Sequence, residues 1–178
     1  DLTTYPVKYA IVADRMFENT LQPFIDWKTK KGFTVVTTYT DIIGSSAANI
    51  QSWVHDQYNS GVPEDPAPSF VLFVGDVAQI PASTTGSSSG QVTDLYYCSV
   101  DGDYFPEMYY GRFSATNTSD LQNMIDKTLY YERYEFADPT YLDNVTLIAG
   151  ADGTWNPAVG QPTIQYGTAN YFNSSYGF

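Results

Sequence analysis

The sequence has very little cysteine and histidine, and both shortages restrict the chemistry open to it. Cys98 is the single cysteine, so no disulfide can form within the chain. His55 is the single histidine, and it lies far from Cys98 in sequence. The chain therefore offers no evident Cys–His or Ser–His catalytic pair.

Positive charge is also scarce, with 8 Lys and Arg against 20 Asp and Glu and a net charge of −12. This balance repels phosphate backbones and attracts cations or basic peptides, so we expect no nucleic-acid partner. No apolar run approaches the roughly 20 residues of a membrane helix, so we expect no membrane span. The charged start at Asp1 lacks the apolar stretch of a signal peptide, and an exported form would have lost its signal already.

The residues that are present predict a globular α/β chain. Of the 178 residues, 43% are apolar and 16% aromatic, which is enough to build a core. Short apolar runs predict strands at Val7–Ala13, Phe33–Tyr39, Phe70–Val74 and Val145–Ala149. Helical spacing predicts helices at 17–31, at about 46–60 behind a Ser45 or Ser46 cap, at 118–135 behind Thr118 or Ser119, and at 162–173 beginning with Pro162.

Strands that alternate with helices imply parallel pairing with right-handed crossovers, and uninterrupted apolar strands imply a sheet covered on both faces. We therefore predict an α/β sandwich with a mainly parallel sheet. Pro81–Gly90 is rich in Ser, Thr and Gly and reads as a loop. Thr93–Ser114 reads as two strands around the turn at 101–103, with Cys98 in the first of them.

Polar residues directly after parallel strands mark the edge of a sheet where ligands bind. Asp14, Asp76 and Asp152 stand at such positions. Together they could form an acidic Mg²⁺ site for phosphoryl chemistry, or each could cap a turn or helix, and capping is the more common role of a lone aspartate.

The segment around Asp101, Asp103 and Glu107 has carboxylates at alternate positions, with the Phe105 carbonyl between them. Such oxygens can converge on one hard cation, and calcium is the natural choice. The loop departs from an EF-hand, because Pro106 replaces the turn glycine and Arg112 stands where a bidentate Glu belongs. A solvated acidic turn is the alternative.

Two further residues are given structural roles. We interpret Cys98 as a buried, unreactive thiol in an aromatic and β-branched run. His55 falls off the apolar stripe of its helix and beside Asp56, which predicts a solvated position.

Several long runs resemble the gingipain family of cysteine peptidases, and its lysine-specific members most. They include Val92–Tyr97, Ser99–Tyr109, Phe70–Asp76, and Leu147–Asp152 followed by Trp155-Asn156-Pro157. The similarity follows nearly the whole chain in order and matches the N-terminal part of the family's catalytic domain. It implies a caspase-like α/β/α sandwich whose catalytic His and Cys lie beyond this chain.

The resemblance also implies roles for individual residues. Asp152 matches the catalytic aspartate that orients the histidine. Trp155 matches a tryptophan beside the substrate cleft, although simple packing is an alternative role for it. Asp101, Asp103, the Phe105 carbonyl and Glu107 match the ligands of a structural Ca²⁺. Asp14 matches no acidic residue in the lysine-specific enzymes, which weakens the magnesium hypothesis.

The implied protein is a secreted or cell-surface bacterial endopeptidase that cleaves proteins or peptides after Lys first and Arg second. Residues 1–143 would form its N-terminal subdomain and 144–178 the start of its catalytic subdomain. The remaining half of the catalytic domain is the expected partner, in the same chain or as a separate one, and this chain alone is expected to be inactive. The alternatives are a non-catalytic, calcium-stabilised secreted binding domain and, with less support, a magnesium-dependent phosphoryl-transfer enzyme.

Overall fold

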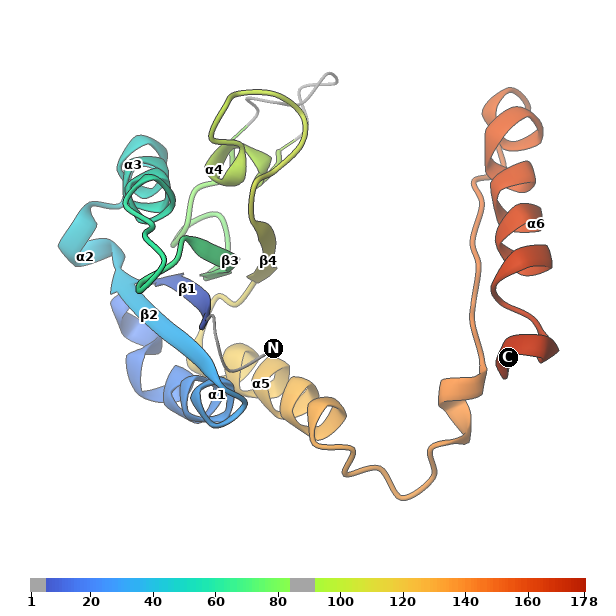
Figure 1. Cartoon of the computed structure of the whole chain (residues 1–178), viewed down its shortest axis with the longest axis horizontal. Coiled ribbons are helices and arrows are strands. Elements are labelled where there is room, and N and C mark those ends of the chain that lie inside the picture. The colour runs from blue at the N-terminus through green and yellow to red at the C-terminus, as the bar shows by residue number, and fades with distance from the viewer. Residues whose placement is uncertain (1–5, 84–91) are drawn as a thin grey trace. The chain divides into compact units, whose positions relative to one another are not determined.

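A four-stranded parallel sheet forms the centre of the first part of the chain (Figure 1). The computed structural model describes residues 6–83 and 92–178. The strands are β1 (Val7–Ala13), β2 (Phe33–Tyr39), β3 (Pro68–Val74) and β4 (Tyr109–Phe113), in the order β2-β1-β3-β4. The predicted parallel α/β fold is therefore confirmed, and the first three strands lie where the apolar runs place them.

Alternate residues of the strands enter two separate cores. In β1, Ile11 and Ala13 face one core while Ala10 and Val12 face the other, and all four are buried. Helices α1 (Glu18–Lys30) and α5 (Thr118–Glu132) complete the first core. Helices α3 (Ala47–Asn59) and α4 (Leu95–Cys98) complete the second core. Because both faces are covered, the central strands β1 and β3 are apolar over most of their length rather than alternating.

The helix ends are set by local capping. Ser46 caps α3, since its side chain accepts a hydrogen bond from Asn49 N at 3.2 Å. The predicted caps of α5 are one or two residues late, because Asn117 accepts the bond from Asp120 N at 3.0 Å. A short helix, α2 (Thr40–Ile43), follows β2 and was not predicted.

Two partly buried ion pairs join elements that are distant in sequence. Lys28 Nζ in α1 lies 2.6 Å from Glu132 at the end of α5, and Glu132 also accepts a hydrogen bond from Trp27 Nε1 at 2.8 Å. Arg112 in β4 binds both carboxylate oxygens of Asp94, at 2.6 and 2.9 Å. A further nitrogen of Arg112 donates to the Gly75 and Ile80 carbonyls, so this one side chain holds the loop ends after β3 and before α4.

The predicted strand pair within Thr93–Ser114 is wrong in its first half. The run Leu95–Cys98 forms α4 instead, with Tyr97 and Cys98 buried against the sheet, and only β4 is a strand. β4 pairs in parallel with β3, so it does not form a hairpin. An aromatic run of four residues fits a buried helical turn as well as a strand, and tertiary packing decides between them. Most of the predicted Pro81–Gly90 loop lies outside the described residues.

The chain divides into two compact units, residues 1–133 and 134–178. The second unit contains 3-10 turns at Thr140–Asp143 and Ser174–Tyr176, a π-helical turn at Asn156–Gly160, and α6 (Gln161–Asn170). Pro162 lies in the first turn of α6, as predicted. The predicted strand at Val145–Ala149 is not formed, because a strand requires a neighbouring ladder and the described residues pair none with it. The predicted subdomain boundary at 143/144 stays a prediction.

Candidate functional site

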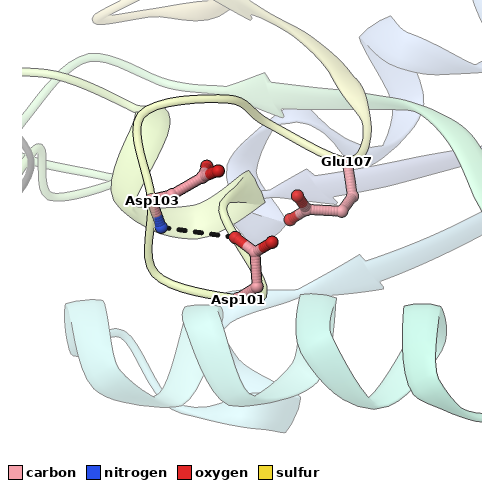
Figure 2. A group of neighbouring side chains, drawn as sticks. All are labelled: Asp101, Asp103 and Glu107. Carbon is pink, nitrogen blue, oxygen red and sulfur yellow. Dashed lines mark hydrogen bonds between the residues drawn. The ribbon is translucent and has the colours of Figure 1, made fainter.

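The loop between α4 and β4 brings three carboxylates together (Figure 2). Ligand oxygens of Asp101, Asp103 and Glu107 all lie within 4.8 Å of one another. Asp101 and Asp103 are exposed, and Glu107 is half-buried. The structure thus brings together the three acidic residues that the alternating pattern singles out.

Backbone contacts fix the shape of this acidic loop, defined as residues 99–108. Glu107 N donates to the Cys98 carbonyl at 3.0 Å, and Ser99 Oγ donates to the Asp103 carbonyl at 2.8 Å. Gly102 has a φ of 82°, a left-handed value that favours glycine at the tip of the turn. The loop is therefore held at both ends by the buried α4 and by its own hydrogen bonds.

Within the loop, the carboxylates also accept backbone hydrogen bonds. Asp101 accepts from Asp103 N at 3.3 Å, Asp103 accepts from Phe105 N at 2.6 Å, and Glu107 accepts from Val100 N at 2.5 Å. Each carboxylate has a second oxygen that accepts none of these three bonds. Three adjacent negative charges repel one another, and a hard divalent cation is the ligand that such oxygens suit. The loop could therefore bind a metal ion.

The strand-end aspartates have separate local roles. Asp14 accepts a hydrogen bond from Met16 N at 2.9 Å and caps the 3-10 turn Arg15–Phe17. Asp76 accepts from Ser114 Oγ at 3.0 Å. Neither belongs to the acidic group of three that the described part of the chain forms. The capping alternative thus gains support over the magnesium hypothesis.

Asp152 organises the turn that leads into the helical segment of the second unit. Its Oδ1 accepts hydrogen bonds from Trp155 N at 2.5 Å and from Thr154 N at 3.0 Å. The bond from the Trp155 N–H lowers the pKa of Asp152, because it favours the charged form. Asp152 is thus an exposed, ionised carboxylate with one oxygen left over, and Trp155, with 70% of its surface exposed, stands on the same turn.

The lone thiol is unsuited to nucleophilic catalysis. Cys98 is the last residue of α4 and is fully buried, and burial raises the pKa of its thiol to about 12. Since the thiolate is the reactive species, almost none of it is present at neutral pH. The interpretation of Cys98 as a structural residue is therefore supported.

His55 is half-buried rather than solvated, so that expectation was wrong. His55 lies in α3 and interacts with the Tyr97 backbone of α4, and its Nε2 is buried without a hydrogen-bond partner among the described residues. Partial burial lowers the pKa of His55, although Glu107 and Asp56 act in the opposite direction. Its position is explained by α4, the helix that the sequence pattern does not reveal.

Comparison with solved proteins defines the class of this fold. The structure called "Structure of Protease" matches with a TM-score of 0.86 and 46% identity, over 98% of this chain and 39% of the solved chain. The crystal structure of the Arg specific cysteine proteinase gingipain R matches with a TM-score of 0.62 and 30% identity, over 70% of this chain and 28% of the solved one. The parallel sheet with helices on both faces is thus the fold of gingipain catalytic domains.

The particular family follows from the sequence comparison. The model described as Peptidase family C25 matches residues 3–176, and the chain belongs to this family of cysteine peptidases. Lys-gingipain W83 of Porphyromonas gingivalis is 46% identical over the whole chain, and Gingipain R2 of the same species is 34% identical over 88% of it. The chain spans 10% and 21% of the lengths of these two relatives. The resemblance to gingipains is confirmed.

Proposed function

We propose that this chain forms part of the catalytic domain of a gingipain-like cysteine endopeptidase and supplies the aspartate that orients the catalytic histidine. The observation that carries the proposal is the match to Peptidase family C25 over nearly the whole chain. Asp152 supports it further, since it is an exposed, ionised carboxylate with an unused oxygen. Such a group can accept a hydrogen bond from an imidazole and stabilise its charged form.

The catalytic histidine and cysteine are proposed to come from the remainder of the domain. The cysteine thiolate would attack the scissile carbonyl, the histidine would protonate the leaving amine, and backbone amides would stabilise the oxyanion. In this chain, Cys98 is buried with a high pKa and His55 is half-buried on another helix, so neither suits these roles. The chain alone is therefore proposed to be inactive.

We assign the substrates as proteins or peptides with a basic residue before the cleaved bond, Lys in preference to Arg. The higher identity to Lys-gingipain W83 than to Gingipain R2, 46% against 34%, supports this order. Trp155 supports it as well, because an exposed indole face can cover the aliphatic stem of a lysine. A secreted or cell-surface location in a bacterium is proposed from the same relatives. None of the described helices is long and apolar enough to cross a membrane.

The exposed surface of the second unit supports the proposal that a partner completes the domain. No residue in 134–178 is buried, while Ile148 is 87% exposed and Tyr166 62% exposed. Apolar surface of this extent marks a face that another structure covers. We propose that the remainder of the catalytic domain covers it, as the same chain or a separate one, and that Val145–Ala149 becomes a strand there.

The acidic loop is proposed to hold one structural Ca²⁺ through Asp101, Asp103, Glu107 and the Phe105 carbonyl. The grouping of the three carboxylates supports the site, and their hard oxygen ligands support calcium over a softer metal. Since the acidic loop leads directly into β4, an ion there would stabilise the fold of the first unit.

The peptidase proposal is tested by producing this chain together with the remainder of its domain and assaying matched peptides that differ only in Lys, Arg or Gln before the scissile bond. Cleavage after Lys, more slowly after Arg and not after Gln, together with labelling by a lysine-mimicking thiol-reactive inhibitor, is the expected result. A folded complex that cleaves none of the three would favour a non-catalytic, calcium-stabilised binding domain.

A further inference from the structure

The few basic residues of this chain are confined to its regular elements. All 8 Lys and Arg residues lie between positions 8 and 133, and residues 134–178 contain none. Each of the 8 stands in a strand, a helix or a 3-10 turn, or directly at the C-terminal cap of a helix. The connections after β3, around the acidic loop and before α5 carry none, although these are the segments that proteases cut most readily.

Five of these residues form ion pairs, and four of the five are Lys8, Arg15, Lys28 and Arg112. Lys8 is 3% exposed with its Nζ 2.7 Å from Asp65, Lys28 is bound to Glu132, and Arg112 is bound to Asp94. Arg15 contacts both Glu18 and Asp41, at 2.9 and 3.0 Å. A peptidase that recognises a basic side chain must draw it into a specificity pocket. That step would break each of these pairs and displace the strand, helix or 3-10 turn that carries the basic residue.

Two residues, Lys30 and Lys127, lie inside α1 and α5. Peptidases bind their substrates as extended chain, so the peptide bonds after these residues become accessible only when the helix unwinds. α5 is anchored by the buried Leu121, Ile125 and Leu129, which makes that local unfolding costly.

The last two residues cap the same two helices and meet at a single cluster. Lys31 Nζ lies 3.2 Å from Glu132, and the Arg133 guanidinium lies 4.9 Å from the centre of the Trp27 ring. Tyr134, which follows Arg133, is 78% exposed and has a φ of 57°. The Arg133–Tyr134 bond is therefore the least protected of the basic sites.

We propose that this placement makes the folded chain resistant to peptidases that cleave after Lys or Arg, and so protects it from the activity proposed for its own domain. The protective role rests on the proposed function, because it requires that the complete domain cleaves after basic residues. The resistance itself does not, and any peptidase of the same specificity can test it. The contrast is sharpest in residues 134–178, where no side chain is buried and the sequence offers no basic residue to recognise.

The test uses trypsin as the basic-specific probe and chymotrypsin as the probe of accessibility, on the folded chain without added calcium. Tyr104 is 67% exposed in the acidic loop and lies outside any helix or strand, so chymotrypsin is expected to cut after it. Tyr104→Lys turns the same bond into a trypsin site, and in the Tyr104→Gln control neither enzyme has a site there. Asn144→Lys creates a trypsin site in the second unit, where residues 144–152 have no regular structure, and Asn144→Gln is its control.

We expect trypsin to cut both lysine variants at least about tenfold faster than the parent chain or either Gln control, with cleavage at the new lysine located by mass spectrometry. The slow cut in the parent chain should fall after Arg133. Trypsin digestion of the parent as fast as that of the lysine variants would overturn the proposal, as would variants no faster than the parent. Cleavage of Lys peptides by the complete domain is measured separately, so a failure of the proposed function is distinguished from a failure of this inference.

Discussion

The two units of the chain differ in burial and in the roles proposed for their residues. Residues up to Arg133 enclose two buried cores on either face of a parallel sheet, whereas residues 134–178 bury no side chain. Yet Asp152, proposed to orient the catalytic histidine, and Trp155, proposed to contact the substrate, both lie in the second unit. Under this proposal, stability depends mainly on the first unit and catalysis on the second, so a substitution should affect mainly one of the two.

A matched pair of isoleucines gives the largest contrast. Ile125→Ala removes a fully buried side chain from the core under α5 and should lower the free energy of unfolding of the chain by about 2–5 kcal/mol. Ile148→Ala removes a side chain that is 87% exposed and should change it by less than about 0.5 kcal/mol. Urea unfolding of the two variants measures both values.

Equal effects of the two substitutions would show that the second unit packs as firmly as the first. In the complete domain the comparison becomes sharper. If Val145–Ala149 forms a strand there, Ile148→Ala should become destabilising while Ile125→Ala keeps its effect.

The sequence predicts most of the first unit because its signals are local. The apolar runs of β1 to β3 and the Ser46 cap act within a few residues, and so do the carboxylates at 101, 103 and 107. They could be located without any tertiary information.

The errors occur where contacts distant in sequence decide. α4 replaces the predicted strand because Tyr97 and Cys98 pack against the sheet, and the half-buried His55 interacts with the Tyr97 backbone of α4. The pairs Lys28–Glu132 and Arg112–Asp94 leave no sequence signal, since the partners lie 104 and 18 residues apart. Val145–Ala149 has the composition of a strand, but composition supplies no neighbouring strand.

Glu132→Gln is expected to have the next largest effect. The carboxylate accepts hydrogen bonds from Trp27, Lys28 and Lys31, and its loss leaves Lys28 with a nearly buried, unpaired charge. We expect a loss of about 2 kcal/mol, less than for a fully buried pair because Glu132 keeps some contact with water. Asp126→Asn, on the exposed side of α5, is the control and should have little effect.

The same carboxylate predicts a pH dependence. Burial alone would raise the pKa of Glu132, but the bonds from Lys28, Trp27 and Lys31 outweigh it and the pKa is lowered. The Glu132 carboxylate therefore makes its full contribution to the free energy of unfolding above its unfolded pKa of about 4.3. That contribution is lost as the pH falls through the lower pKa of the folded state. The free energies of unfolding of the parent and Glu132→Gln should converge as the pH is lowered from 6 to 3. A difference that stays constant over this range would contradict this explanation.

Calcium should stabilise the first unit by a smaller amount. At a calcium concentration tenfold above the dissociation constant, binding to the folded state alone adds about 1.4 kcal/mol. Asp103→Ala should abolish this increment and change the stability measured in chelator only slightly, through the lost hydrogen bond from Phe105 N, whereas Asp126→Ala should keep the increment. Thermal unfolding with and without calcium measures the increment. A parent chain that calcium does not stabilise would refute the calcium site and leave the peptidase proposal intact.

Asp152→Asn is expected to have the smallest effect on stability and to separate the two units most cleanly. The amide oxygen can still accept the bonds from Thr154 and Trp155, so the free energy of unfolding should change by less than about 0.5 kcal/mol. In the complete domain, the turnover should fall, because the neutral amide cannot stabilise an imidazolium by charge. We expect a drop of about 10- to 100-fold, smaller than in a serine peptidase, because a thiol ionises more readily than a hydroxyl and depends less on its base.

Asp138→Asn is the control for this prediction. Asp138 is also exposed, also accepts a backbone hydrogen bond and also has a lowered pKa, but it lies outside the proposed site. Equal turnover of both variants and the parent from pH 6 to 8 would show that Asp152 only shapes its turn.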